Sequence, residues 1–267
     1  MVEGTATGEH LPSLSAISEA QWASLARRRI FFGHQSVGYN IMDGVADLLA
    51  ANPQIRLTVT ESRELDSSQA PAFRHASIGR NSYPLEKLED FAAVSHRGFG
   101  ADGGIGMVKL CFEDVGPDTD AGALFGEYRK RMAELRARHP GLTIVHFTMP
   151  LKEPENWKGY VRKKLRGEPL EVESNAVRNR YNALLRQAYE GTEPIFDVAR
   201  LESTLPDGRR TFSRRGADTV YVLAPLHTDD GGHLNAAARR MVAEQLLILL
   251  ARLEAPAPAA AASSSGG

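Results

Sequence analysis

The chain has 267 residues, of which 42% are hydrophobic and 24% charged, values typical of one large globular domain. Its formal net charge of -1 gives no electrostatic reason to expect nucleic acid or an anionic membrane as the main partner. A single cysteine, Cys111, excludes an intrachain disulfide and a multi-cysteine zinc site, and no apolar run approaches the roughly 18 residues of a membrane span.

Strand-like and helix-like segments alternate along the chain. Apolar runs predict five strands: Arg28–Gly33, Ile55–Thr60, Ile105–Phe112, Leu142–Phe147 and Pro194–Val198. Apolar residues at helical spacing predict helices after the first strand and over Leu85–Val94, 124–135, 177–188 and Ala236–Leu253. This alternation indicates a parallel sheet covered by helices on both faces. We therefore expect an α/β fold, a three-layer α/β/α sandwich with a five-stranded parallel sheet in the flavodoxin-like order 2-1-3-4-5.

The two ends and one internal stretch differ from the rest of the chain. We expect residues 13–254 to form a single domain, with flexible tails at 1–12 and 255–267, because the last segment is of low complexity. The first residues lack the pattern of a secretory signal, which favours a cytoplasmic location. The basic stretch 152–174 is expected to be a solvated surface excursion, with contact to an anionic ligand as the alternative.

Ser36 lies where the first predicted strand turns into the first predicted helix. The strand runs into Gly33, and the helix begins near Val37 or Gly38. A hydroxyl at this point lies beside a helix N-terminus, where backbone N–H groups favour negative charge. Ser36 is therefore a candidate nucleophile, and the alternative is an ordinary helix N-cap, a role that serine fills well.

His233 and Asp230 form a second candidate group just before the last predicted helix. Histidine suits the role of general base because imidazole ordinarily titrates near neutrality. Asp230 lies close enough along the chain to hold the other ring nitrogen, and Gly231-Gly232 permit the tight path that this needs. The alternative is a turn-forming aspartate beside an incidental histidine.

The strand ending in Gly-x-x-Ser and the Asp-x-x-His before the last helix together resemble the SGNH (GDSL-like) hydrolase superfamily. The segment Phe32–Gly38, Phe-Gly-His-Gln-Ser-Val-Gly, is similar to the first block of a bacterial branch. The resemblance extends over Arg28–Leu250 and implies a three-layer fold, ester hydrolysis and a triad of Ser36, His233 and Asp230. It also implies a small acyl group such as acetyl, carried by a small-molecule or carbohydrate ester.

Two blocks depart from the family pattern. Gly33-His34-Gln35-Ser36 replaces Gly-Asp-Ser, so an extra residue precedes the serine. Residues 109–114 read Lys-Leu-Cys-Phe-Glu-Asp where the family has Gly-x-Asn-Asp. The asparagine that helps to bind the oxyanion is therefore not at its usual place.

Other residues must then supply the donors that a tetrahedral oxyanion requires. We expect the Ser36 N–H, with Gly79 and Asn81, to act as these donors; the alternative is that Gly79 and Asn81 only form a loop. His34 and Gln35 are expected to line the pocket, with packing of His34 into the helix layer as an equal alternative.

We predict an ester hydrolase that needs no cofactor and no metal. An O-acyltransferase would use the same triad with an alcohol in place of water, and a non-catalytic ligand-binding module on the same fold is another alternative. Metal-assisted hydrolysis is a further one, because four neighbouring residues are of zinc-ligand types: His227, Asp229, Asp230 and His233. Nucleic acid is not expected as a partner, and the sequence leaves the oligomeric state open.

Overall fold

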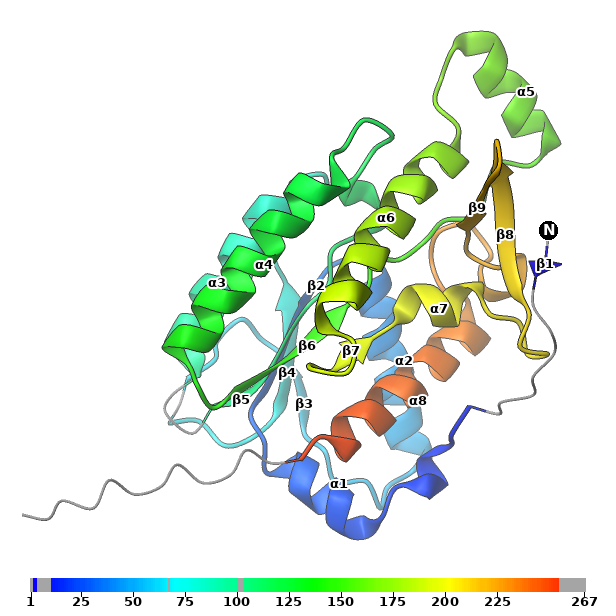
Figure 1. Cartoon of the computed structure of the whole chain (residues 1–267). Helices are drawn as coiled ribbons and strands as arrows, with labels where there is room; N and C mark the ends of the chain where they lie inside the picture. The colour runs from blue at the N-terminus through cyan, green and yellow to red at the C-terminus, as the bar shows by residue number, and fades with distance from the viewer. Residues whose placement is uncertain (1, 4–10, 67, 100–102, 255–267) are drawn as a thin grey trace, which may run out of the picture.

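The computed structural model describes residues 2–3, 11–66, 68–99 and 103–254 (Figure 1). The C-terminal tail expected at 255–267 and most of the N-terminal tail expected at 1–12 lie outside the described residues. Within the described ranges, no helix is long and apolar enough to cross a lipid bilayer.

A parallel sheet forms the centre of the fold, as expected for the α/β class. In the described part of the chain it has six strands, in the order β3 (Val59–Glu61), β4 (Phe73–Ser77), β2 (Ile30–His34), β5 (Gly104–Val108), β6 (Leu142–Phe147) and β7 (Ile195–Phe196). Every neighbouring pair in this sheet is parallel.

The prediction of five strands in the order 2-1-3-4-5 is therefore wrong. Strand β4 was missed, and it lies between the first two strands that the sequence predicted. Its sequence, Phe-Arg-His-Ala-Ser, lacks the apolar run by which buried strands are recognised. His75 is nevertheless buried there, because its ring stacks on that of His34 in β2.

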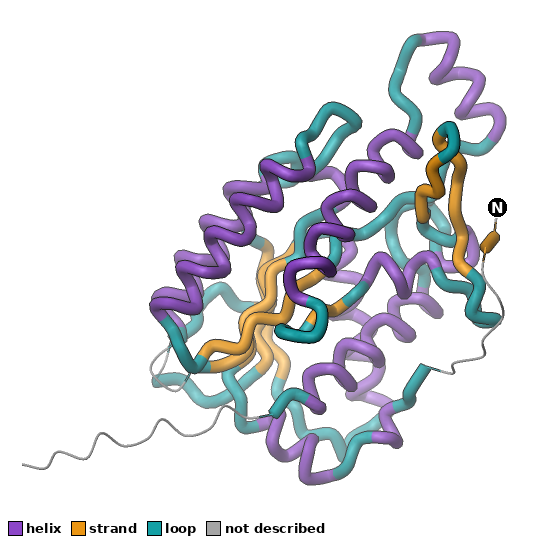
Figure 2. The backbone as a smooth tube through the Cα atoms, in the orientation of Figure 1, coloured by secondary structure: helices purple, strands orange, loops and turns teal. Residues whose placement is uncertain are grey.

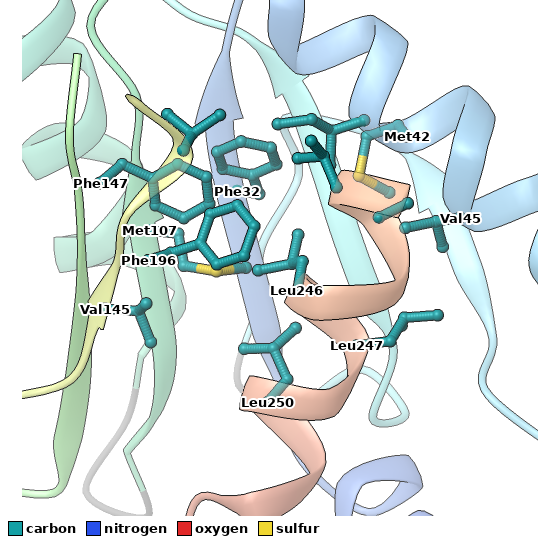
Figure 3. Close-up of a cluster of buried hydrophobic side chains, with 14 of the residues drawn as sticks. Phe32, Met42, Val45, Met107, Val145, Phe147, Phe196, Leu246, Leu247 and Leu250 are labelled. Atoms are coloured by element: carbon teal, nitrogen blue, oxygen red, sulfur yellow. The ribbon is translucent and has the colours of Figure 1, made fainter. Parts of the chain in front are cut away.

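Helices cover both faces of this sheet (Figures 1 and 2). One face carries α1 (Glu19–Ala26), α2 (Val37–Ala51) and α8 (Ala236–Arg252); the other carries α3 (Pro84–Gly98), α4 (Ala121–Arg138) and α6 (Glu171–Tyr189). Neighbouring residues Phe31 and Phe32 belong to different apolar clusters, because successive side chains of a strand point to opposite faces. In Figure 3, sheet residues Phe32, Met107 and Phe147 meet side chains of α2 and α8.

The remaining elements lie at the periphery. They are β1 (Val2–Glu3), α5 (Trp157–Arg166), α7 (Val198–Ser203), β8 (Arg210–Arg215), β9 (Asp218–Tyr221) and the short 3-10 helices Leu14–Ala16, Phe112–Asp114 and Pro225–His227. Strands β8 and β9 form an antiparallel hairpin, and β1 pairs with β8.

Helices α2 and α8 pack side by side along the same face. Near their beginnings, Asn40 Oδ1 accepts a hydrogen bond from the Leu234 N–H at 3.2 Å. Further along, the Arg239 guanidinium donates to Asp47 at 2.8 Å. Gly44 lies between these contacts, and a Cβ atom there would stand 2.4 Å from the Arg239 carbonyl oxygen. Only glycine allows this close approach of the two backbones.

Gly44→Ala is therefore expected to lower the free energy of unfolding by about 1–3 kcal/mol, because the added methyl group would force α2 away from α8. Urea denaturation measures this change. The matched control is Gly126→Ala in α4, where a Cβ meets nothing within 4 Å. That control should stabilise the protein by roughly 0.5–1 kcal/mol, since alanine is the better helix former. Equal stability of the two variants would contradict the close approach.

Candidate active site

Ser36 connects β2 to α2 in a strained backbone conformation. Its φ of 52° and ψ of -115° are rare for a residue with a side chain, and such a residue carries roughly 1–3 kcal/mol of strain. Although Ser36 occupies the N-cap position of α2, its side chain makes no capping hydrogen bond with the described residues. Its Oγ lies instead 2.7 Å from His233 Nε2. The sharp turn thus presents the hydroxyl to the imidazole rather than to the helix.

Asp230 holds His233 from both its backbone and its ring. Asp230 Oδ1 accepts hydrogen bonds from the His233 N–H at 2.7 Å and the Gly232 N–H at 2.9 Å. Asp230 Oδ2 lies 2.7 Å from His233 Nδ1. A carboxylate can only accept, so Nδ1 carries the proton, and in the neutral ring Nε2 is free to accept one from Ser36. Gly231 lies between them with a φ of +82°, a conformation that suits glycine.

The Asp230 carboxylate is held in its charged form. The hydrogen bond from the His233 backbone N–H is the largest cause that lowers its pKa well below the ordinary range; the His233 ring and the Gly232 N–H lower it further. Together these donors outweigh the desolvation of the carboxylate, which acts to raise the pKa. Asp230 therefore stays ionised beside the imidazole.

Phe112 and Lys152 lie beside the loop of residues 230–233 that carries His233. The Phe112 ring meets the His233 ring edge-on, with 5.7 Å between ring centroids. The Lys152 ammonium lies 5.1 Å from the centre of the Phe112 ring. The Glu153 N–H donates to the Gly231 carbonyl at 2.9 Å. No place in the site was predicted from the sequence for Phe112, the last residue of a predicted strand. Lys152 entered only as the first residue of the basic stretch 152–174.

His34 lies beneath the Ser36 turn and does not line a pocket. Its side chain is fully buried, and its Nε2 lies 3.0 Å from His75 Nδ1. Burial, assisted by the charges of His75 and Lys109, lowers the pKa of His34 to about 2, so the ring is neutral. The His34 ring packs against those of Tyr39 in α2 and His75 in β4. Gln35 is partly exposed, and its amide donates to the Ile78 and Gly79 carbonyl oxygens at 2.8 and 2.5 Å.

The two loop residues expected to bind an oxyanion, Gly79 and Asn81, differ in whether their N–H donors are already bound. The Gly79 N–H already donates to Asp90 Oδ2 at 2.9 Å, so it is not free. Asn81 is exposed, and its Oδ1 accepts a hydrogen bond from Lys87 Nζ at 2.8 Å. The oxygen of the amide is thus engaged, while the nitrogen Nδ2 has no acceptor among the described residues.

A buried ion pair fixes this loop. Lys87 Nζ lies 2.7 Å from Asp114 Oδ1, and both side chains are fully buried. Asp114 also accepts hydrogen bonds from the Ser82 N–H at 3.0 Å and the Cys111 N–H at 2.6 Å. The same carboxylate therefore ties the 79–83 loop to the segment after β5. The sequence did not reveal this pair, because the two residues lie 27 positions apart with no common motif.

A second buried lysine stands where the family pattern has its Gly-x-Asn-Asp block. Lys109 Nζ donates to Cys111 Sγ at 3.2 Å and to the Leu110 carbonyl at 3.3 Å. Cys111 is itself buried, and its thiol lies 3.6 Å from the Gln35 carbonyl oxygen. Lys109 therefore lies under the Ser36 turn rather than at its surface.

The residues of zinc-ligand types do not converge. His227 is buried, and its Nδ1 lies 3.0 Å from the Glu202 carbonyl oxygen, whereas Asp229 and His233 are exposed. Among the described residues, no three such side chains come together in a geometry that suits a metal ion.

Solved structures of lipases and esterases share the general path of the chain at low identity. A GDSL-like lipase from Bacteroides thetaiotaomicron is 13% identical, with a TM-score of 0.46 over 86% of this chain and 94% of the other. The acetyl xylan esterase AlAXEase is 16% identical, with a TM-score of 0.46 over 82% and 98%. A carbohydrate esterase family 3 protein from Talaromyces cellulolyticus is 14% identical, with a TM-score of 0.42 over 84% and 98%. No family model and no curated protein matches the chain. With TM-scores below 0.5, these likenesses carry no inference about the chemistry of the site.

Glu202 is a buried acid behind the loop that borders the site. Its Oε2 accepts a hydrogen bond from the Leu151 N–H at 2.9 Å, and its Oε1 has no partner among the described residues. Burial raises the pKa of Glu202 from 4.5 to about 8, against the lowering effects of the Leu151 N–H, Lys109 and Arg178. Between these two pH values the folded chain binds a proton at Glu202 that the unfolded chain has released.

This proton makes stability depend on pH. The contribution of Glu202 is fully present below pH 4.5 and is lost as the pH rises toward about 8. Glu202→Gln keeps an acceptor for Leu151 and cannot ionise, so its free energy of unfolding should fall less than that of wild type over this range. Urea denaturation at several pH values measures the difference, with exposed Glu113→Gln as control. Identical pH slopes for Glu202→Gln and wild type would contradict the buried, protonated state.

Proposed function

We propose that this protein is a serine esterase that hydrolyses a small acyl ester through a triad of Ser36, His233 and Asp230. The observation that supports this most directly is the unbroken series of contacts from Ser36 Oγ to His233 Nε2 and from His233 Nδ1 to Asp230 Oδ2, each 2.7 Å long. A hydroxyl, an imidazole and an ionised carboxylate in this order form the arrangement that activates a serine. Acetyl is the acyl group that the sequence resemblance favours.

The proposed reaction has two halves. Ser36 Oγ attacks the ester carbonyl carbon while its proton passes to His233 Nε2, and a tetrahedral oxyanion forms. The bond to the alcohol oxygen then breaks, and His233 returns the proton to that oxygen, which leaves an acyl-serine. Water next attacks the acyl carbon and gives a proton to Nε2. The bond from the acyl carbon to Ser36 Oγ then breaks, Nε2 returns the proton to Oγ, and the carboxylic acid leaves. Asp230 remains ionised and stabilises the imidazolium in each half.

Two donors are proposed for the oxyanion. The Ser36 N–H donates to no acceptor among the described residues and lies beside its own Oγ. The Asn81 side chain is the second proposed donor, because Lys87 engages its oxygen and its NH₂ group has no acceptor among the described residues. Gly79 is not included, since its N–H is bound to Asp90.

Ser36→Ala should reduce the rate of p-nitrophenyl acetate hydrolysis by roughly 10⁴-fold or more, because no other nucleophile is held against His233. Steady-state kinetics measures the loss, and thermal unfolding checks that the fold persists. The matched control is Ser24→Ala in α1, which should keep full activity. A fluorophosphonate probe should label wild type and Ser24→Ala but not Ser36→Ala.

These measurements also separate the alternatives. A wild-type chain that neither hydrolyses the ester nor takes the label would favour the non-catalytic ligand-binding module. If the probe labels the chain, and the acyl group is transferred to an added alcohol rather than released as free acid, the O-acyltransferase is favoured. Full activity of Ser36→Ala would remove the triad from consideration.

Asn81→Ala should lower kcat by about 10²–10³-fold, the usual loss on removal of one oxyanion donor. KM should change little, because the interaction forms mainly in the transition state. Ser82→Ala, the exposed neighbour, serves as control, since only its backbone bonds to Asp114. Wild-type kcat in Asn81→Ala would show that the second donor lies elsewhere.

A further inference from the structure

Helix α5 projects from the body of the molecule. Figure 1 shows it beyond the beginning of α6, away from the central sheet. It has ten residues, all of them described, and none is buried. An open hollow of about 410 Å³ on this helix is lined by α5 residues alone, so no other described element covers that face. A helix in this position gains little from packing against its own protein.

Large apolar side chains gather along one side of α5. Leu165 is 83% exposed, Trp157 76% and Tyr160 40%. At 100° per residue, these three and Val161 occupy an arc of about 140°. The Trp157 and Tyr160 rings stack with 6.0 Å between centroids. Lys164 also falls within this arc, where its ammonium lies 6.0 Å from the centre of the Tyr160 ring. Exposed apolar residues that gather on one side of a helix, rather than at single scattered positions, indicate a binding surface.

Cations surround this apolar side. The helix carries five of them and no acid: Lys158, Arg162, Lys163, Lys164 and Arg166. Lys163 pairs with Glu155, and Arg166 approaches Glu168 at 3.7 Å. The other three have no carboxylate partner among the described residues. This local excess of positive charge contrasts with the net charge of -1 for the whole chain.

We propose that α5 docks on the surface of an anionic lipid bilayer. Its apolar arc would enter the boundary between headgroups and acyl chains, where tryptophan and tyrosine are favoured, while its cations meet the anionic headgroups. A helix about 15 Å long and about 10 Å wide is small for a protein partner, because stable protein interfaces bury about 800 Å² on each side. A lipid surface sets no such minimum area.

The docking helix is joined to the candidate active site. The segment before α5 includes Lys152, whose ammonium lies near Phe112, and Glu153, whose N–H binds the Gly231 carbonyl. Only a few residues of the chain therefore separate helix α5 from the end of the sheet where Ser36 lies. The docking proposal does not depend on the proposed catalysis, and Ser36→Ala should bind vesicles as wild type does.

Vesicle binding with Trp157 as the probe tests this proposal. The chain has two tryptophans, so Trp22→Phe leaves Trp157 as the only reporter. Vesicles of phosphatidylcholine with phosphatidylglycerol should sediment the protein and shift Trp157 emission to the blue. Pure phosphatidylcholine vesicles should bind it roughly tenfold more weakly or not at all, and salt should weaken the anionic binding.

Two variants separate the apolar and ionic contributions. Leu165→Glu places a charge in the apolar arc and should reduce binding by roughly tenfold or more, while Leu11→Glu, at another exposed leucine, should not. Arg162→Glu should weaken binding only to the anionic vesicles. The proposal is overturned if no vesicle binds, or if both compositions bind equally. It is also overturned if size-exclusion chromatography shows a dimer that Leu165→Glu dissociates while vesicles stay unbound, which would assign the apolar side to a second copy of the chain.

Discussion

Helix α2 begins directly after Ser36, and helix α8 begins just beyond His233, so the packing of these two helices decides whether the hydroxyl and the imidazole meet. The contact depends on Gly44, where the two backbones approach too closely for a side chain, and on the hydrogen bond between Asn40 and Leu234. Apolar side chains of both helices then bury against the sheet face that contains Phe32 (Figure 3). Ser36 and His233, which lie 197 positions apart in the sequence, thereby come within hydrogen-bond distance of each other.

Much of the fold follows from local apolar patterns. Strand β6 was predicted with its actual bounds, Leu142–Phe147, because apolar residues make up four of its six positions and occur on both faces, and the run is too short for a buried helix. Strand β4 was not predicted, since Arg74 and His75 interrupt its apolar character. The burial of His75 depends on a neighbouring strand, and such tertiary compensation leaves no local signal.

The candidate site was predictable to the extent that its residues adjoin element boundaries. Ser36 stands directly before a helix that the pattern of apolar residues reveals, and His233 stands three residues before another. The Lys87–Asp114 pair could not be foreseen, because nothing local indicates which carboxylate a buried lysine will meet. The stretch 152–174 was predicted to be solvated because of its charges. That prediction did not take into account that Trp157 and Leu165 fall on one side of a helix, α5.

The positive φ of Ser36 limits which residues can replace it. Glycine adopts such a φ without penalty, and a β-branched residue adopts it worst of all, so threonine is a poor substitute even though it carries a hydroxyl. A lineage selected for thermal robustness alone would drift toward glycine at this position. Serine at this position therefore carries backbone strain that glycine would avoid, but only serine supplies the hydroxyl that contacts His233.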